Sequence, residues 1–144
     1  MTETVPRLSG LPAEVDLKRD EILQAARSGD AEAVAALAAD RFSYTFGGPV
    51  EGGPAAYWRE LEASGEQPLE ALAAILELPY TLATGIYVWP FAYDKTEDQI
   101  TDYERELLST LPADAATFVP GGGYLGWRAG IEPDGDWIFL VSGD

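Results

Sequence analysis

Histidine, cysteine and asparagine are absent from the 144-residue sequence. Without histidine and cysteine, the chain cannot form a Ser-His-Asp triad, a cysteine nucleophile, a thiolate metal site or a disulfide. Without asparagine, it has no acceptor for N-glycosylation. Any catalysis would rest on Asp, Glu, Tyr, Ser, Lys or Arg, or on a hard cation held by oxygen ligands. No recognised catalytic motif is present, which favours a protein without enzymatic activity and without a cofactor. A catalytic pair of carboxylates among the 25 acids stays open as an alternative.

Positive charge is scarce as well. Nine Lys and Arg residues stand against 25 Asp and Glu residues, which gives a formal net charge of −16. So few basic residues could not neutralise the phosphates of a nucleic acid, and we expect no direct nucleic-acid binding. A basic partner protein, or solubility alone, is the better explanation of such an acidic chain.

The sequence lacks long apolar runs. None approaches the roughly eighteen residues of a membrane-spanning helix. Residues 1–7 have neither the basic start nor the apolar core of a signal peptide. These features predict a cytoplasmic protein that does not bind membranes.

Apolar residues are nevertheless plentiful. They make up 47% of the chain and include four Trp, seven Tyr and five Phe. This composition is typical of a folded domain and not of an acidic disordered tail. The length fits one globular domain over residues 1–144.

The first half of the sequence predicts helices. The first helix ends at Gly29, a left-handed cap, and Asp30 is the N-cap of a second helix over residues 31–39. Two shorter helices are expected after Pro54 and over residues 69–78. The apolar residues of the first helix recur at near-helical spacing: Leu11, Val15, Ile22 and Ala26.

The middle of the chain predicts two strands and one more helix. Residues 41–46 alternate in polarity, and residues 85–91 are β-branched and aromatic, with a proline that suggests an edge strand or an irregular wall. A capping box at residues 101–104, or a second one at residues 96–99, begins the helix. Its expected buried face is Ile100, Tyr103, Leu107 and Leu111.

The C-terminal residues 124–142 predict a β-hairpin. The sequence from Glu132 to Asp136 suits a three-residue loop with a G1 bulge, with Gly135 in the left-handed conformation. The register that follows pairs Ile131 with Trp137, Ala129 with Phe139, and Trp127 with Val141. In this register Arg128 lies on the opposite face, between Gly126 and Gly130.

Together these elements predict an α+β fold. A helical N-terminal half packs on a small antiparallel sheet that ends in the C-terminal β-hairpin.

Arg128 is the first candidate for a binding site. Its guanidinium, beside Tyr124 and in a depression cleared by two glycines, could bind a carboxylate or phosphate through two hydrogen bonds. Alternatively, it pairs with an acid of residues 94–106. We favour this structural interpretation, because buried charges are normally paired.

A group of aromatic residues is the second candidate. Its members could form the wall of an apolar ligand pocket with polar tips, although core packing is the commoner role of such residues. The group lies within 24 residues and comprises Tyr80, Tyr87, Trp89, Tyr93 and Tyr103.

Three other patterns are assigned to turns and caps. Residues 94–105 begin like an EF-hand loop, but Gln99 and Arg105 occupy the positions of its essential Gly and Glu. The acids of residues 132–136 are explained by turn chemistry. Residues 121–126 match G-x-G-x-x-G, but a strand follows instead of the helix that the dinucleotide motif requires. We therefore predict no metal site.

Residues 27–42 resemble the start of nuclear-transport-factor-2-like (SnoaL-like) domains. The residues that carry the resemblance are Arg27-Ser28-Gly29-Asp30-Ala31-Glu32-Ala33 and Leu37-Ala38-Ala39-Asp40-Arg41-Phe42. The resemblance implies helices packed on a curved antiparallel sheet that forms a cone, with a small-molecule-binding or isomerase-like function. Because this chain has no histidine and no acid that matches a family motif, no catalytic residue is carried over.

The second half resembles uncharacterised domains from proteobacterial genomes. The resemblance is carried by residues 72–79, Val88-Trp89-Pro90 and the closing pattern Gly126-Trp127-Arg128-x-Gly130-Ile131-x-x-Asp134-Gly135-x-Trp137-x-Phe139 through Gly143-Asp144. It implies no particular activity, and it implies that relatives are often exported.

Three functions remain open at this point. The leading one is an acidic, non-enzymatic binding or interaction module. The second is a nuclear-transport-factor-2-like small-molecule-binding or isomerase-like domain. The third is an inhibitor or immunity-type protein that acts on a basic partner. The expected partner is thus a small anionic ligand or a basic protein.

Overall fold

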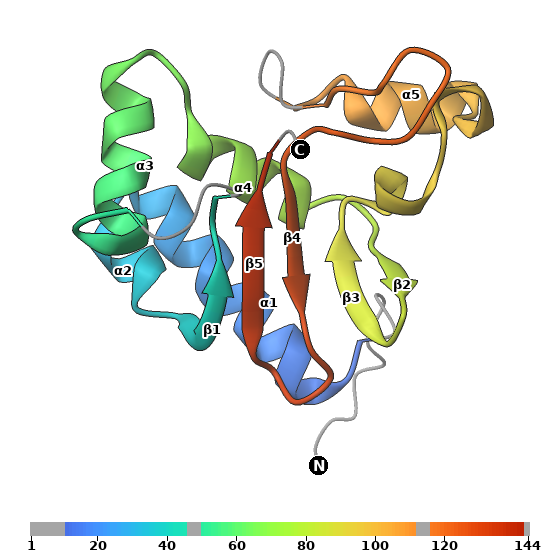
Figure 1. The fold of residues 1–144 in the computed structure, drawn as a ribbon. Helices are drawn as coiled ribbons and strands as arrows, with labels where there is room; N and C mark the ends of the chain where they lie inside the picture. The colour runs from blue at the N-terminus through green and yellow to red at the C-terminus, as the bar shows by residue number, and fades with distance from the viewer. Residues whose placement is uncertain (1–10, 46–49, 112–115, 143–144) are drawn as a thin grey trace.

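The computed structural model describes residues 11–45, 50–111 and 116–142. These residues form an α+β fold, as predicted, with one five-stranded sheet. Its strands lie in the order β1 (Ala38–Ser43), β5 (Trp137–Val141), β4 (Arg128–Ile131), β3 (Ile86–Trp89) and β2 (Thr81–Ala83). Helices α1 (Ala13–Ser28) and α4 (Pro68–Leu76) cover one face of the sheet, and α5 (Asp102–Leu108) lies beyond one end of it (Figure 1). No helix within these segments is long and apolar enough to cross a lipid bilayer.

Both predicted caps at the junction of α1 and α2 are confirmed. Helix α1 (Ala13–Ser28) ends at Gly29, which has a φ of 75°. The side chain of Asp30 then accepts hydrogen bonds from the backbone N–H groups of Glu32 and Ala33, at 3.1 and 3.2 Å. This caps α2 (Ala31–Ala35) and satisfies two donors that the helix itself leaves open.

Helix α2 is four residues shorter than predicted, because the chain continues into β1 (Ala38–Ser43). Strand β1 pairs in parallel with β5 (Trp137–Val141), so the sheet is mixed and not wholly antiparallel. Phe42 packs edge-on against Trp137, with ring centroids 4.7 Å apart. This pairing and packing outweigh the helix propensity of the alanines before β1.

Helices α3 (Gly53–Ala63) and α4 (Pro68–Leu76) each have a proline in the first turn, as predicted. The prolines fit there because the first N–H groups of a helix have no partner within it. Helix α4 is buried along most of its length, and it packs against both α1 and β4 (Arg128–Ile131).

Strands β2 (Thr81–Ala83) and β3 (Ile86–Trp89) form a hairpin that the sequence did not predict as a pair. The expectation of an edge strand was wrong, because β3 lies between β2 and β4. Pro90 follows the last residue of β3. Its missing N–H therefore removes no hydrogen bond from the sheet.

Two short 3-10 helices, η1 (Phe91–Asp94) and η2 (Glu97–Gln99), lead to α5 (Asp102–Leu108). Both predicted capping boxes form, one at each of the last two helices. The predicted buried face was wrong at Tyr103, which is 70% exposed, whereas Leu108 is buried. Because α5 begins after Ile100, that residue and Tyr103 do not share a helical face.

The C-terminal hairpin of β4 and β5 forms around the predicted turn. The N–H of Glu132 donates to the carbonyl of Asp136 at 2.8 Å, Gly135 has a φ of 96°, and Ile131 lies opposite Trp137. The next pairs were predicted wrongly. Ile138 is an extra residue in β5, so that the remaining pairs are Gly130–Phe139, Ala129–Leu140 and Arg128–Val141.

The bulge at Ile138 decides which side chains enter the core. Ala129, Ile131 and Leu140 join the helices in one continuous apolar cluster. Because side chains alternate along a strand, Arg128 and Phe139 point to the face that the helices leave open.

Candidate functional site

A groove of about 620 Å³ lies on the helix-free face of the sheet. We call it the sheet-face groove. Its described lining comes mainly from β1 and β5, with one residue each from β4 and η1: Asp40, Arg41, Phe42, Ser43, Tyr93, Arg128, Ile138, Phe139 and Val141. Two candidates from different parts of the sequence, Arg128 and Tyr93, therefore meet in one groove.

Arg128 is 9% exposed, and its Nη1 donates a hydrogen bond to the carbonyl of Gly126 at 3.0 Å. This bond fixes part of the guanidinium to the backbone of its own strand. The space that Gly130 clears beside it is filled by Phe139, since a Cβ at residue 130 would come within 2.3 Å of the ring. The depression expected around Arg128 is thus narrowed by an aromatic side chain.

Tyr124 lies in the same buried region but not in the lining of the sheet-face groove. Its hydroxyl donates to the carbonyl of Trp127 at 2.9 Å. Burial raises the pKa of Tyr124, while the neighbouring Arg128 acts in the opposite direction. Tyr124 is therefore a neutral hydrogen-bond donor that holds the chain before β4.

The other aromatic candidates lie apart from Tyr93. The Tyr93 ring faces Phe139 across the groove, at 6.4 Å between centroids. Trp89 is buried in the core, and Tyr87 packs against Tyr80 at 5.4 Å. Tyr103 is exposed on α5. The structure thus divides the aromatic group between the core, the surface and the sheet-face groove.

Sequence analysis missed Arg41 as a site residue. Its Nη2 lies 3.2 and 3.3 Å from the two carboxylate oxygens of Glu132, in the turn of the C-terminal hairpin. These residues are 91 positions apart and meet because β1 pairs with β5. No local sequence pattern predicts the parallel pairing of two strands that lie so far apart in the sequence.

A second groove, of about 590 Å³, lies where the ends of α1 and α3 meet the start of α4. We call it the acidic groove. Its floor includes two buried apolar residues, Ala26 and Leu69. The described lining residues are Ala26, Arg27, Gly29, Glu62, Glu66, Gln67, Leu69, Glu70 and Ala73.

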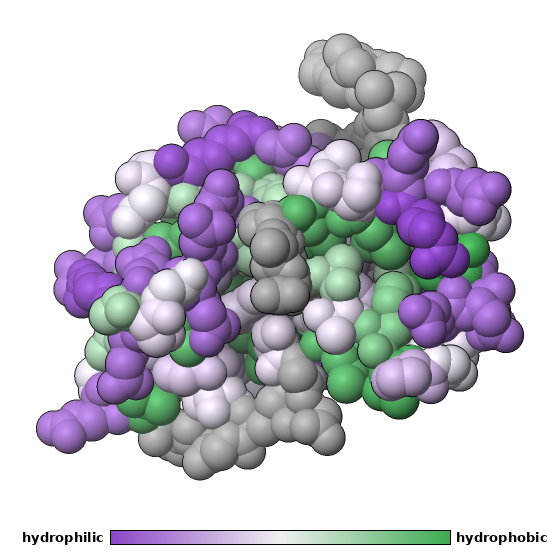
Figure 2. Space-filling model, turned by 90° about the horizontal axis from the view of Figure 1, so that it is seen from above, coloured by the Kyte–Doolittle hydropathy of each residue, from purple (hydrophilic) through white to green (hydrophobic). Residues whose placement is uncertain are grey.

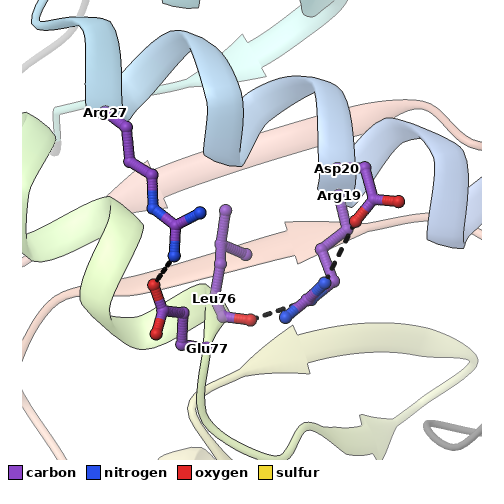
Figure 3. A network of polar contacts seen from close by, with 5 residues as sticks. All are labelled: Arg19, Asp20, Arg27, Leu76 and Glu77. Carbon is purple, nitrogen blue, oxygen red and sulfur yellow. Dashed lines mark hydrogen bonds and ion pairs between the residues drawn. The ribbon is translucent and has the colours of Figure 1, made fainter.

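Arg27, which lines this groove, is engaged with a carboxylate outside it. It forms an ion pair with Glu77, just after α4, and both side chains are about half exposed (Figure 3). About two turns earlier in α1, Arg19 Nε donates to the carbonyl of Leu76 at 2.8 Å. These contacts join α1 to the end of α4 and leave three exposed glutamates around the groove.

The end of α3 next to the acidic groove has an unfavourable charge pattern. Its last turn carries Glu60 and Glu62 and no basic residue. The C-terminus of a helix is already negative through the aligned peptide dipoles, so cations and not anions are favoured there. Burial is the main cause that raises the pKa of Tyr57, and the nearby charges of Glu66 and Glu60 add to it.

One group of three carboxylates in the described segments is close enough to hold a cation: Glu132, Asp134 and Asp136. Two of them already have partners. Glu132 binds Arg41, and Asp134 accepts a hydrogen bond from the N–H of Asp136 at 3.0 Å. Turn formation and the ion pair account for these acids.

Hydrophilic side chains form most of the outline of the molecule when it is seen from the end of the sheet (Figure 2). Hydrophobic side chains gather nearer the centre of this view, on the side of α5.

No family model, no curated protein and no solved structure matches this chain. The function must therefore be inferred from the geometry of the two grooves.

Proposed function

We propose that the protein is a non-enzymatic interaction module whose acidic groove binds a basic segment of a partner protein. An inhibitor or immunity-type protein is one form that such a module takes. The observation that carries the proposal is the end of α3, whose last turn carries Glu60 and Glu62 and no basic residue, and whose Glu62 lines the groove.

A cationic segment would relieve an unfavourable local potential. Negative side chains at a helix C-terminus destabilise the free protein by a few tenths of a kcal/mol each, up to about 1 kcal/mol. A lysine or arginine placed in the groove would meet Glu62, Glu66 and Glu70 as well as the end of the helix. The net charge of −16 would also steer a basic partner toward the protein and raise the association rate.

The floor of the acidic groove suits the same partner. Ala26 and Leu69 form its buried floor, and the partly buried Ala73 adds apolar surface near the glutamates. Lysine and arginine carry an aliphatic stem that packs on such surface while the charged head remains in water. Binding would therefore combine a modest apolar contact with several ion pairs.

The described residues of this groove do not suggest catalysis. Acid–base catalysis usually needs two carboxyl groups whose environments differ, one of them buried. Glu62, Glu66 and Glu70 are all exposed. Because the three glutamates have similar, exposed environments, the groove favours binding over acid–base catalysis.

The test compares two double variants of equal charge. The first, Glu62→Gln with Glu66→Gln, removes two acids from the groove. The second, Glu51→Gln with Glu106→Gln, removes two exposed acids that do not line it. The probe is a fluorescent peptide rich in lysine and arginine, and its Kd is measured by anisotropy.

We expect the groove variant to weaken binding roughly three- to tenfold and the control variant to change it less than twofold, since each exposed ion pair contributes about 0.2–1 kcal/mol. Added NaCl should weaken the wild-type complex. Equal losses in both variants would refute the groove as the binding site and leave only non-specific attraction.

A further inference from the structure

The sheet-face groove differs from the acidic groove in the charged residues that line it. Its described lining holds two arginines, Arg41 and Arg128, and one carboxylate, Asp40. The whole chain has only nine basic residues against 25 acidic ones. Two of the nine basic residues therefore lie at one groove, and one of them, Arg41, is paired with Glu132.

We propose that the sheet-face groove is a binding site for a small carboxylate attached to an aromatic or branched apolar body. This site goes beyond the interaction with a basic partner proposed above and does not depend on it. The two grooves have no described lining residue in common.

Arg128 provides a fixed positive charge at the groove. It is about nine-tenths buried, and the hydrogen bond to the Gly126 carbonyl limits its motion. Because the guanidinium is already held in place, the binding of a ligand would restrict its motion little further.

Arg41 shows that this end of the groove accommodates a carboxylate. Its Nη2 lies at nearly equal distances from both carboxylate oxygens of Glu132, 3.2 and 3.3 Å. The Arg41 side chain is 75% exposed, so this ion pair is weak and exchangeable. A ligand carboxylate can therefore take the place of Glu132, which acts as an internal competitor.

The apolar residues that line the groove, here called the apolar wall, favour a ligand with an apolar body. Phe139, Ile138 and Val141 come from β5, and the Tyr93 ring faces Phe139. Phe139 occupies this position because residue 130 has no side chain. The volume of about 620 Å³ lies within the range of small-molecule sites, roughly 300–1,000 Å³.

The experiment titrates the full chain with benzoate and, as a neutral control of the same shape, with benzamide. Amide chemical shifts of the 15N-labelled protein give the Kd and locate the site. We expect benzoate to shift the resonances of Gly130 and Phe139, with a Kd in the millimolar range, and benzamide to bind at least fivefold more weakly.

Two variants test the role of each charged partner. Arg41→Gln should weaken benzoate at least threefold, whereas Arg59→Gln, an exposed arginine of α3 paired with Glu32, should leave its Kd unchanged. Glu132→Gln should tighten benzoate two- to fivefold by releasing Arg41, in line with the strength of an exposed ion pair. Asp134→Asn removes the same charge from the same turn and should have no effect.

Three results would overturn the proposal. The first is the absence of saturable shifts in the groove for wild type and for Glu132→Gln. The second is equal binding of benzoate and benzamide. The third is an equal loss in Arg41→Gln and Arg59→Gln. An unchanged Kd in Glu132→Gln would refute the competition by Glu132. None of these results bears on the peptide binding of the acidic groove, so the two proposals fail separately.

Discussion

The ring of Phe139 lies directly against the backbone of Gly130 in the neighbouring strand. A Cβ built on residue 130 would be 2.3 Å from Cε2 of the ring and 2.7 Å from Cζ. The two residues are opposite each other because Ile138 bulges out of β5. The bulge, the glycine and the apolar wall of the sheet-face groove are therefore parts of one arrangement.

Gly130→Ala should destabilise the protein by about 1–3 kcal/mol, because the added methyl group overlaps the ring. Urea unfolding followed by tryptophan fluorescence measures the loss. Phe139→Leu in the same protein should recover part of it, since the smaller side chain leaves room for the alanine. If the destabilisation of the double variant equalled the sum of the two single losses, the contact between these residues would contribute nothing to stability.

The turn of this hairpin could be predicted, whereas its register could not. Gly135 marks the turn, because its left-handed conformation favours a residue without a side chain. The bulge at Ile138 has no such marker. Trp137, Phe139 and Val141 alternate as an undistorted strand would, and the core selects Leu140 by packing against helices far away in the sequence.

The candidate site was foreseen only in part, for the same reason. Arg128 and Tyr93 were identified from their residue types and local surroundings. Arg41 was missed because its role depends on the parallel pairing of β1 with β5. Tyr103 was misplaced because the residues that cap α5 set where the helix begins, and with it the direction of each side chain.

Gly135→Val should destabilise the protein by more than about 2 kcal/mol. Residue 135 has a φ of 96°, which strains a β-branched side chain, and its Cβ would lie 3.1 Å from the backbone carbonyl oxygen of Glu14. Gly121→Val is the matched control. Gly121 has a φ of 69° and open space around its Cβ, so it reports backbone strain alone.

The difference in melting temperature between these two variants isolates the contact of the turn with the start of α1. We expect Gly135→Val to melt at the lower temperature. Equal melting temperatures would mean that α1 moves aside without loss and that only the backbone conformation matters.

The melting temperature of the wild-type protein should rise as NaCl is added over the first few tenths molar. With a net charge of −16, repulsion between carboxylates opposes the compact state, and salt screens it most strongly in this range. The salt bridges of the described segments are largely exposed, so screening them removes little stability. Differential scanning fluorimetry gives the trend, and a flat or falling curve would show that the acids are compensated locally.

Trp58 and Trp137 are stacked in the core at 6.2 Å between ring centroids, and both are fully buried. They differ in the indole N–H. Trp137 Nε1 donates to the carbonyl of Phe139 at 3.0 Å, whereas Trp58 Nε1 has no hydrogen-bond partner among the described groups. A buried donor without a partner destabilises a folded protein by about 1–3 kcal/mol.

Replacing each tryptophan with phenylalanine therefore separates packing from hydrogen bonding. Both substitutions remove the same volume and leave similar cavities. Trp137→Phe also breaks a hydrogen bond, whereas Trp58→Phe removes an unsatisfied donor. We expect Trp137→Phe to be the more destabilising by at least about 1 kcal/mol. Urea unfolding measures both losses, provided that the m-values agree. An equal loss, or a larger one in Trp58→Phe, would mean that the Trp58 N–H is satisfied in solution and that the stacked pair is held by packing alone.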